Sequence, residues 1–177
     1  CIKKNYKDCV NSSLNIEKAP NKTTDKAVET IKTKDSVSAD FQAGVDAYQA
    51  GDYATAYKEF KAAAEQGDAI AQNNLGVMHH YGWGVKTNYK EALRFYRLAA
   101  PQVVQSQYSL GAMYYQGQGV NQDIVIAYMW FYVAAKNGNP RSKGNVNVLA
   151  KEMKPKQIAK AEKLAHECIK KNYKDCG

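Results

Sequence analysis

The residues of this chain best suited to chemistry are four cysteines, which form two pairs of identical spacing, Cys1/Cys9 and Cys168/Cys176. On a continuous helix, two residues eight apart would be separated by about 12 Å along the axis, whereas a disulfide allows only about 7 Å between Cα atoms. A disulfide between Cys168 and Cys176 therefore requires a helix that ends between them. Asn172 is a suitable left-handed stop for that helix.

A zinc site fits these cysteines less well than disulfides do. Zinc ligands usually lie two to four residues apart, and only His166 is close to a cysteine pair. An even number of paired cysteines favours disulfides and a periplasmic or extracellular protein, although four cysteines allow three connectivities. Cys1 would also suit a lipidated bacterial amino terminus, which we consider the weaker interpretation.

Other patterns give little support for catalysis. Gly82–Gly84 and Gly117–Gly119 resemble phosphate loops, but neither follows a predicted strand or continues to a third glycine or a Lys-Ser/Thr pair. His79 and His80 would point about 100° apart on a helix and lack the spacing of a metal pair, so we expect one packed and one exposed. With no hydrolase elbow or distinctive carboxylate pair, we expect a non-enzymatic protein with no cofactor and no metal.

Composition predicts an all-α protein without a transmembrane segment. The 177 residues include only four prolines and few alternating β-branched runs, and the apolar stretches are shorter than the roughly 20 residues that span a membrane. The net charge of +8 comes almost entirely from lysine, which argues against an Arg-rich reader of specific nucleic-acid sequences. Residues 151–177 are especially Lys-rich, as expected for a solvated face or for a weak anionic partner.

The chain repeats itself at an offset of 35 residues, which indicates helix pairs. Small residues at the repeated positions would let two antiparallel helices cross closely, and nearby aromatic residues would fill the gaps between pairs. Glycines mark expected helix ends, and Asp52, Asp68 and Asn88 are candidate N-caps. The positions from Leu75 to Ala100 that recur 35 residues later are Leu75, Gly76, Gly82, Gly84, Val85, Ala92, Ala99 and Ala100.

The repeated segments LGVMHHYGWGVKTNYKEALRFYRLAA and SLGAMYYQGQGVNQDIVIAYMWFYVAA resemble the Sel1-like repeat family. GVDAYQAGDYATAYKEFKAAAEQGD resembles the related tetratricopeptide repeat, and MKPKQIAKAEKLAHECIKKNYKDC resembles the closing helix of bacterial members, with Pro155 in its first turn. The resemblance implies an α/α solenoid of antiparallel helix pairs with a C-terminal capping helix. The turn Pro101–Val104 departs from the pattern and leaves the helix joint after Ala100 open.

The N-terminal residues differ from the repeat region in composition. We expect residues 1–38 to form a flexible segment and linker, and residues 39–177 to form the repeat domain. Within the first part, a short helix around Asp25–Thr33 would be marginal alone. The nonapeptide CIKKNYKDC at 1–9 recurs unchanged at 168–176, which suggests either self-association through the duplicated segment or a remnant without a role.

The family resemblance implies that the first helix of each pair lines a concave groove. Tyrosine and asparagine suit a peptide groove, because asparagine can bind an extended backbone and tyrosine adds apolar area with one hydrogen bond. We therefore expect an adaptor that binds a protein or peptide partner; the alternatives are a cell-wall or β-lactam-related hydrolase of the cysteine-rich Sel1-like type and a binder of anionic envelope polymer. The expected groove residues are Phe41, Val45, Tyr48, Asn73, Asn74, Val77, His80, Tyr108, Ala112, Tyr115 and Gln116.

Overall fold

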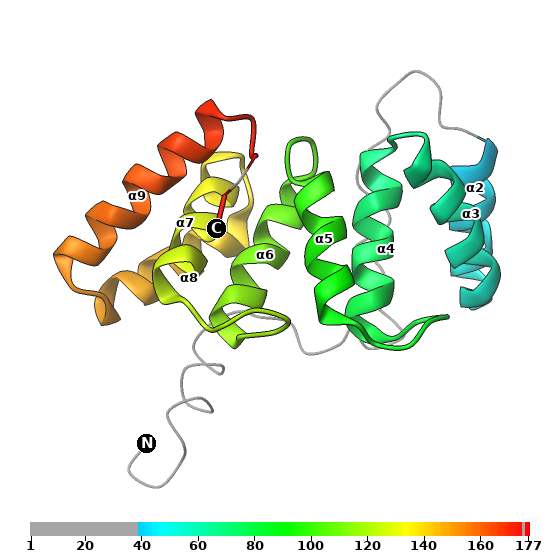
Figure 1. Cartoon of the computed structure of the whole chain (residues 1–177), viewed down its shortest axis with the longest axis horizontal. Helices are drawn as coiled ribbons and strands as arrows, with labels where there is room; N and C mark the ends of the chain where they lie inside the picture. The colour runs from blue at the N-terminus through cyan, green and yellow to red at the C-terminus, as the bar shows by residue number, and fades with distance from the viewer. Residues whose placement is uncertain (1–38, 175) are drawn as a thin grey trace, which may run out of the picture. The chain divides into compact units, whose positions relative to one another are not determined.

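The computed structural model of the chain describes residues 39–174, 176 and 177, and every regular element in this part is an α-helix. The expectations for Cys1, Cys9, the linker and the helix at Asp25–Thr33 lie outside the described residues. The helices are α2 (Ala39–Gln49), α3 (Tyr53–Glu65), α4 (Ala69–Tyr81), α5 (Tyr89–Ala99), α6 (Val104–Gln116), α7 (Ile124–Lys136), α8 (Pro140–Glu152) and α9 (Pro155–Lys170) (Figure 1).

The helices belong to two compact units, of which the first holds α2–α5 and the second holds α6–α9. In the first unit each helix packs against the next one, and in the second unit α6 and α8 pack against α7, as does α9. The most extensive contacts are within the pairs α2/α3, α4/α5 and α6/α7. The predicted all-α fold of antiparallel helix pairs is therefore confirmed.

Three helix starts confirm the predicted caps. The carboxylates of Asp52 and Asp68 accept hydrogen bonds from the backbone N–H of Thr55 and Ala71, at 3.1 and 2.7 Å. The Asn88 side-chain oxygen accepts from the N–H of Glu91 in the same way. Each bond satisfies one of the N–H groups that the first turn of a helix leaves without a partner, so the polar residues after the turns fix where α3, α4 and α5 begin.

Glycine sets the distance between the helices of a pair. A Cβ on Gly76 of α4 would lie 2.7 Å from the ring of Tyr96 of α5, and Gly111 of α6 stands in the same relation to Phe131 of α7. Because such a distance is too short for a real Cβ, only glycine lets the helix backbone approach the ring. The small residues of the 35-residue pattern thus lie where two helices cross, as predicted.

The core of the second unit is built around α7. Trp130 and Phe131 are fully buried, as is nearly every residue from Ala127 to Ala134. Both α8 and α9 pack against α7, and they contribute Leu149 and Ala161 to the buried set. An apolar helix that is covered on most sides by other helices is a core helix, and α9 closes the unit as its last helix.

The sequence did not predict where the helix that contains Ala100 ends. In the structure, α5 ends at Ala99 and α6 begins at Val104. Ala100 caps α5, and the backbone N–H groups of Gln102 and Val103 donate to the carbonyl of Ala99, so a tight turn replaces the expected glycine. Among the described residues, no helix combines the length and apolar character needed to cross a membrane.

Candidate functional site

The expected groove residues lie on the first helix of each pair, where their spacing places them in rows. Phe41, Val45 and Tyr48 of α2 are separated by four and three residues, so they share one face of the helix. Equivalent rows are Asn73, Val77 and His80 on α4, and Tyr108, Ala112 and Tyr115 on α6. We call these three rows, together with the neighbouring Asn74 and Gln116, the first-helix stripe.

Most of the stripe is buried. Val45, Val77, His80 and Gln116 are half-buried, whereas the aromatic members and the asparagines are nearly inaccessible. Tyr115, for example, is 6% exposed and Asn74 is 5% exposed. The accessible area of the stripe therefore belongs mainly to its half-buried members. The buried members are part of the packing beneath that surface.

Asn74 has an unusual polar environment within the stripe. Its side-chain nitrogen Nδ2 is buried and has no hydrogen-bond partner among the described residues. An unpaired buried donor costs about 1–3 kcal/mol, so such groups are uncommon in folded proteins. Val77 lies three residues further along α4, on the same face and partly open to solvent. Because the Asn74 nitrogen is itself covered, an acceptor that lies on Val77 reaches it only when the covering side chains move.

The two histidines occupy different environments. His79 is buried, stacks on the ring of Phe95 at 5.6 Å, and its Nε2 lies 3.4 Å from the hydroxyl of Tyr57. Burial lowers the pKa of His79 below its usual value, with Glu91 raising and Arg94 further lowering it by charge. His80 is half-buried rather than exposed, so the expected contrast between the two residues holds only for His79.

Three aromatic rings form a stack beside the α4–α5 loop. Trp83 is stacked between Tyr53 and Tyr81, with ring centroids 5.6 and 5.2 Å apart, and Tyr48 approaches its ring at 5.7 Å. Gly84 has a φ of +69°, and a Cβ there would collide with the backbone carbonyl of Tyr53. Gly84 is thus required by the close passage of this loop over the start of α3, whereas Gly82 is the left-handed C-cap of α4.

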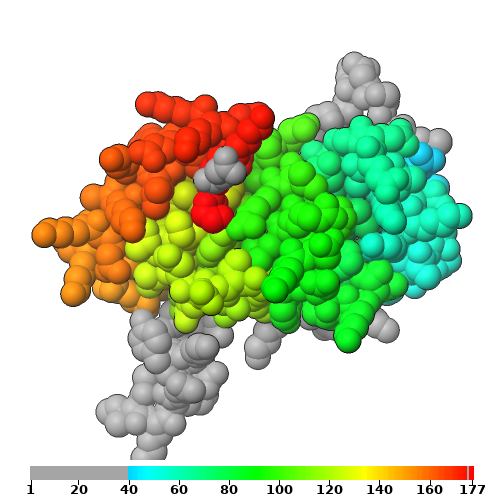
Figure 2. Space-filling model, viewed as in Figure 1, coloured from blue at the N-terminus to red at the C-terminus, as the bar shows by residue number. Residues whose placement is uncertain are grey.

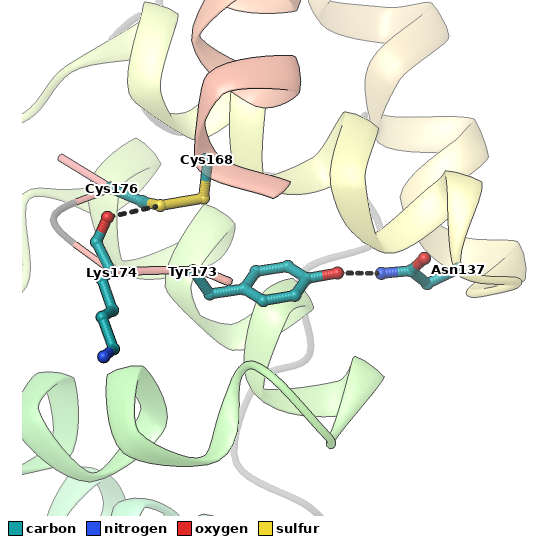
Figure 3. Close-up of a disulfide and its surroundings, with 5 residues drawn as sticks. All are labelled: Asn137, Cys168, Tyr173, Lys174 and Cys176. Atoms are coloured by element: carbon teal, nitrogen blue, oxygen red, sulfur yellow. Dashed lines mark hydrogen bonds between the residues drawn. A yellow bond between two sulfur atoms is a disulfide. The ribbon is translucent and has the colours of Figure 1, made fainter. Parts of the chain in front are cut away.

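The cysteines of the second unit form a disulfide. Cys168 in α9 is bonded to Cys176, with the two Cα atoms 5.3 Å apart (Figure 3). The helix ends at Lys170, and Asn172 has a φ of +50°, so the left-handed stop lies where the sequence placed it. Tyr173 also adopts a left-handed conformation, with a φ of +64°. Both cysteines are buried.

A hydrogen bond from α7 also holds this terminal turn, and the sequence did not predict it. Nδ2 of Asn137, at the C-cap of α7, donates to the hydroxyl oxygen of Tyr173 at 3.0 Å (Figure 3). The same nitrogen donates to Oε1 of the buried Gln107 at 2.9 Å. The available signal was that Asn137 directly precedes Gly138, a predicted helix end, and that Tyr173 lies in a duplicated segment. Neither observation indicates that the two residues meet.

The described residues contain no group of three or more His, Cys, Asp or Glu side chains arranged to hold a metal ion. The lysines of the last helix and tail are all exposed, and Lys163 forms a long ion pair with Glu167 at 4.0 Å. Figure 2 shows α9 (orange to red) as a continuous part of the visible surface of its unit. This surface is basic and solvated.

The helix pairs and their crossing glycines define an α/α solenoid, a class of repeat protein. The Sel1 repeat model matches residues 69–101 and 104–139, which together contain α4–α7. The chain therefore contains two Sel1 repeats. Proteins with such repeats are generally adaptors that bind other proteins.

Relatives and solved structures agree with this assignment. The protein sel-1 homolog 2 of Rattus norvegicus is 43% identical over 76 residues, which cover 42% of this chain and 11% of that protein, and the human homologue is 42% identical over the same length. The chain therefore spans about a tenth of these curated relatives.

Two bacterial structures share the fold. A protective antigen present in uropathogenic Escherichia coli strains, which displays an SLR fold, is 33% identical with a TM-score of 0.72, covering 78% of this chain and 31% of the other. A Sel1 repeat protein from Oxalobacter formigenes is 32% identical with a TM-score of 0.58, covering 61% and 46%.

Proposed function

We propose that this protein is a non-enzymatic adaptor that binds an extended protein segment along the part of the first-helix stripe that lies on α2 and α4, within the first unit. The observation that carries the proposal is the buried amide nitrogen of Asn74, which lacks an acceptor among the described residues. A bound segment that moves the covering side chains and brings a backbone carbonyl to this nitrogen would satisfy it and remove the cost of an unpaired donor. General support comes from the Sel1 repeats, since proteins with these repeats bind protein partners.

The half-buried stripe residues supply the apolar part of this interface. Val45 on α2 and Val77 and His80 on α4 retain accessible area beside buried neighbours. An extended segment on such a surface would place its side chains against Val77 and His80 and its backbone against asparagine amides. Buried members such as Tyr115 would contribute indirectly, by holding the helices in place.

The compartment follows from the cysteines. Both partners of the Cys168–Cys176 disulfide are buried, and a structural disulfide persists in an oxidising environment. We infer that the adaptor functions in the periplasm or outside the cell, where envelope or extracellular proteins would be its partners. A bond to Cys1 or Cys9 lies outside the described residues.

The test is selection of peptides from a random displayed library with the full chain as bait, followed by anisotropy titration of the best peptide. Val77→Glu and Asn74→Ala should each weaken binding more than fivefold, which corresponds to about 1 kcal/mol. Val148→Glu, at another half-buried valine outside the stripe, is the matched control and should bind as the parent does. Failure of both stripe variants to weaken binding would contradict the proposal.

Two further measurements address the alternatives. Binding to a groove of apolar side chains should change little with salt, whereas an anionic polymer held by the exposed lysines of α9 would be released steeply as salt rises. Turnover of a chromogenic β-lactam or of purified cell wall by the intact chain would instead support a hydrolase. We expect neither turnover nor a steep salt dependence.

A further inference from the structure

The nonapeptide Cys168–Cys176, which we call the C-terminal hook, is docked on the second unit at one specific place. Its disulfide closes the turn, and its Tyr173 hydroxyl accepts a hydrogen bond from Asn137 of α7. The same Asn137 nitrogen is oriented by Oε1 of the buried Gln107 on α6. We call Asn137 and Gln107 the hook site; Figure 3 shows Asn137 with Tyr173.

The shape of the hook depends on its own residues. Asn172 and Tyr173 both have positive φ values, which are unfavourable for side-chain-bearing residues, although asparagine tolerates them better than most. The disulfide and the bond to Asn137 compensate for this strain by closing and anchoring the turn. A second peptide would reproduce this docking if it supplied two cysteines eight apart, an asparagine and a tyrosine in the same order.

The chain contains such a peptide. Residues 1–9 have the same nine residues in the same order, so Cys1, Asn5, Tyr6 and Cys9 correspond to the hook residues just described. Identical sequences have identical conformational preferences and identical hydrogen-bonding groups. We propose that the hook site also accepts the Cys1–Cys9 nonapeptide of a second chain, so that chains associate by exchanging one copy of the nonapeptide for the other.

The residue that follows each copy makes the exchange conditional. Gly177 has a φ of +78°, and a Cβ at this position would lie 2.8 Å from Cγ2 of Ile126. Val10 follows the N-terminal copy, so its branched side chain would clash there unless the backbone left the site differently. The C-terminal copy is also held beside the site by α9. The chain's own hook is therefore favoured, and exchange grows when that hook is weakened or the concentration is high.

Association by this route has a defined geometry. Each chain offers one hook site in its second unit and one N-terminal copy, so the contact joins different surfaces of the two partners. Such a heterologous contact does not close on itself unless a ring forms, and it can extend into a chain of molecules. This assembly is independent of peptide binding on the first-helix stripe.

Tyr173→Phe in the full chain tests the proposal, because it removes the Asn137 acceptor from the C-terminal copy and leaves Tyr6 intact. We expect sedimentation velocity to show a mass that rises with concentration more strongly than for the parent. Adding Tyr6→Phe should return the protein to monomer, and adding Val10→Gly should tighten association about fivefold. The synthetic disulfide-closed nonapeptide CIKKNYKDC, in excess, should dissociate the assemblies.

Tyr89→Phe, at an exposed tyrosine of α5, is the matched control and should sediment as the parent does. Asn137→Ala in the Tyr173→Phe background should abolish association, with helicity checked by circular dichroism. The proposal is overturned if the Tyr173→Phe protein stays monomeric at every concentration. This holds both if the hook site is then empty and if it binds the N-terminal copy of the same chain, because neither joins two chains. Association that persists with Tyr6→Phe overturns it equally.

Discussion

The ring of Tyr96 packs directly on Gly76 where α4 and α5 cross, and a Cβ on that glycine would lie 2.7 Å from two atoms of the ring. Tyr96 is 1% exposed, so the ring cannot move away without disturbing the core. Gly111 and Phe131 repeat the relationship in the second unit. Because protein interiors are close-packed, this contact fixes the spacing of the two helices in each pair.

Gly76→Ala should therefore destabilise the protein by about 1–3 kcal/mol, the usual cost of overpacking a core, and Gly111→Ala should do the same. Gly144 is the matched control, since it lies in α8 with no atom within 4 Å of an added Cβ. Gly144→Ala should stabilise by about 0.5–1 kcal/mol through helix propensity. Urea unfolding gives the free energy of unfolding of all three variants. A Gly76→Ala protein more stable than the parent would show that glycine is not needed where α4 and α5 cross.

The crossing glycines and the polar caps could be predicted from sequence because both leave local, periodic signals. Gly76 and Gly111 recur at the repeat offset, and Asp52 and Asp68 follow glycine-containing turns. The contact of Asn137 with Tyr173 could not be predicted in the same way. It joins residues 36 apart, and no periodicity records a hydrogen bond that depends on how a terminal turn folds back.

The same limit applies to the first-helix stripe. Family resemblance could assign Tyr108, Ala112 and Tyr115 to one helix face, because that follows from spacing. It could not give their exposure, since that depends on which side chains cover the face, and the structure buries all three. Their part in partner binding remains a prediction, whereas the half-buried Val77 and His80 are better positions at which to measure it.

His79 should make stability depend on pH. Burial lowers its folded-state pKa, so the unfolded chain binds a proton more readily as the pH falls through the ordinary histidine pKa of about 6.5. The stabilising effect of neutral His79 is thus fully present above that value and is lost as the pH decreases toward the folded pKa. His79→Phe keeps an aromatic ring to stack on Phe95 and removes the titrating group.

Urea unfolding between pH 8 and pH 5 checks this expectation, with His79→Phe compared with the parent at each pH. The variant should lose less stability than the parent over this range, whatever its stability at pH 8. Glu91 also has a lowered pKa, chiefly because Arg94 donates to its carboxylate, but a carboxylate contributes in a more acidic range. Parallel pH curves for the two proteins would show that His79 is not responsible.

Asp123 should be important for the start of α7. Its carboxylate oxygen Oδ1 accepts hydrogen bonds from the backbone N–H groups of Val125 and Ile126, at 2.8 and 3.0 Å. Asp123→Ala leaves both donors without this partner and should cost about 0.5–2 kcal/mol. Asp123→Asn retains a side-chain oxygen and should cost much less. Thermal unfolding distinguishes them, and equal losses would indicate that charge rather than capping dominates.

The Cys168–Cys176 disulfide should stabilise the second unit mainly by restricting the unfolded tail. For a loop this short, the chain-entropy relation gives about 2–3 kcal/mol, so Cys168→Ala with Cys176→Ala should lower the free energy of unfolding by about that amount. The comparison is made in a background with Cys1→Ser and Cys9→Ser, which leaves one cysteine pair. Urea unfolding, followed by circular dichroism, measures the difference.

Reductant provides the internal control for this prediction. It should lower the stability of the background protein by the amount that the two alanine substitutions remove, and it should leave the alanine variant unchanged, because that protein has no disulfide to reduce. Alkylation of the unreduced, denatured background protein followed by intact-mass analysis tests the bond itself. Two modified thiols before reduction would show that Cys168 and Cys176 are not joined, and the stabilisation would then have another source.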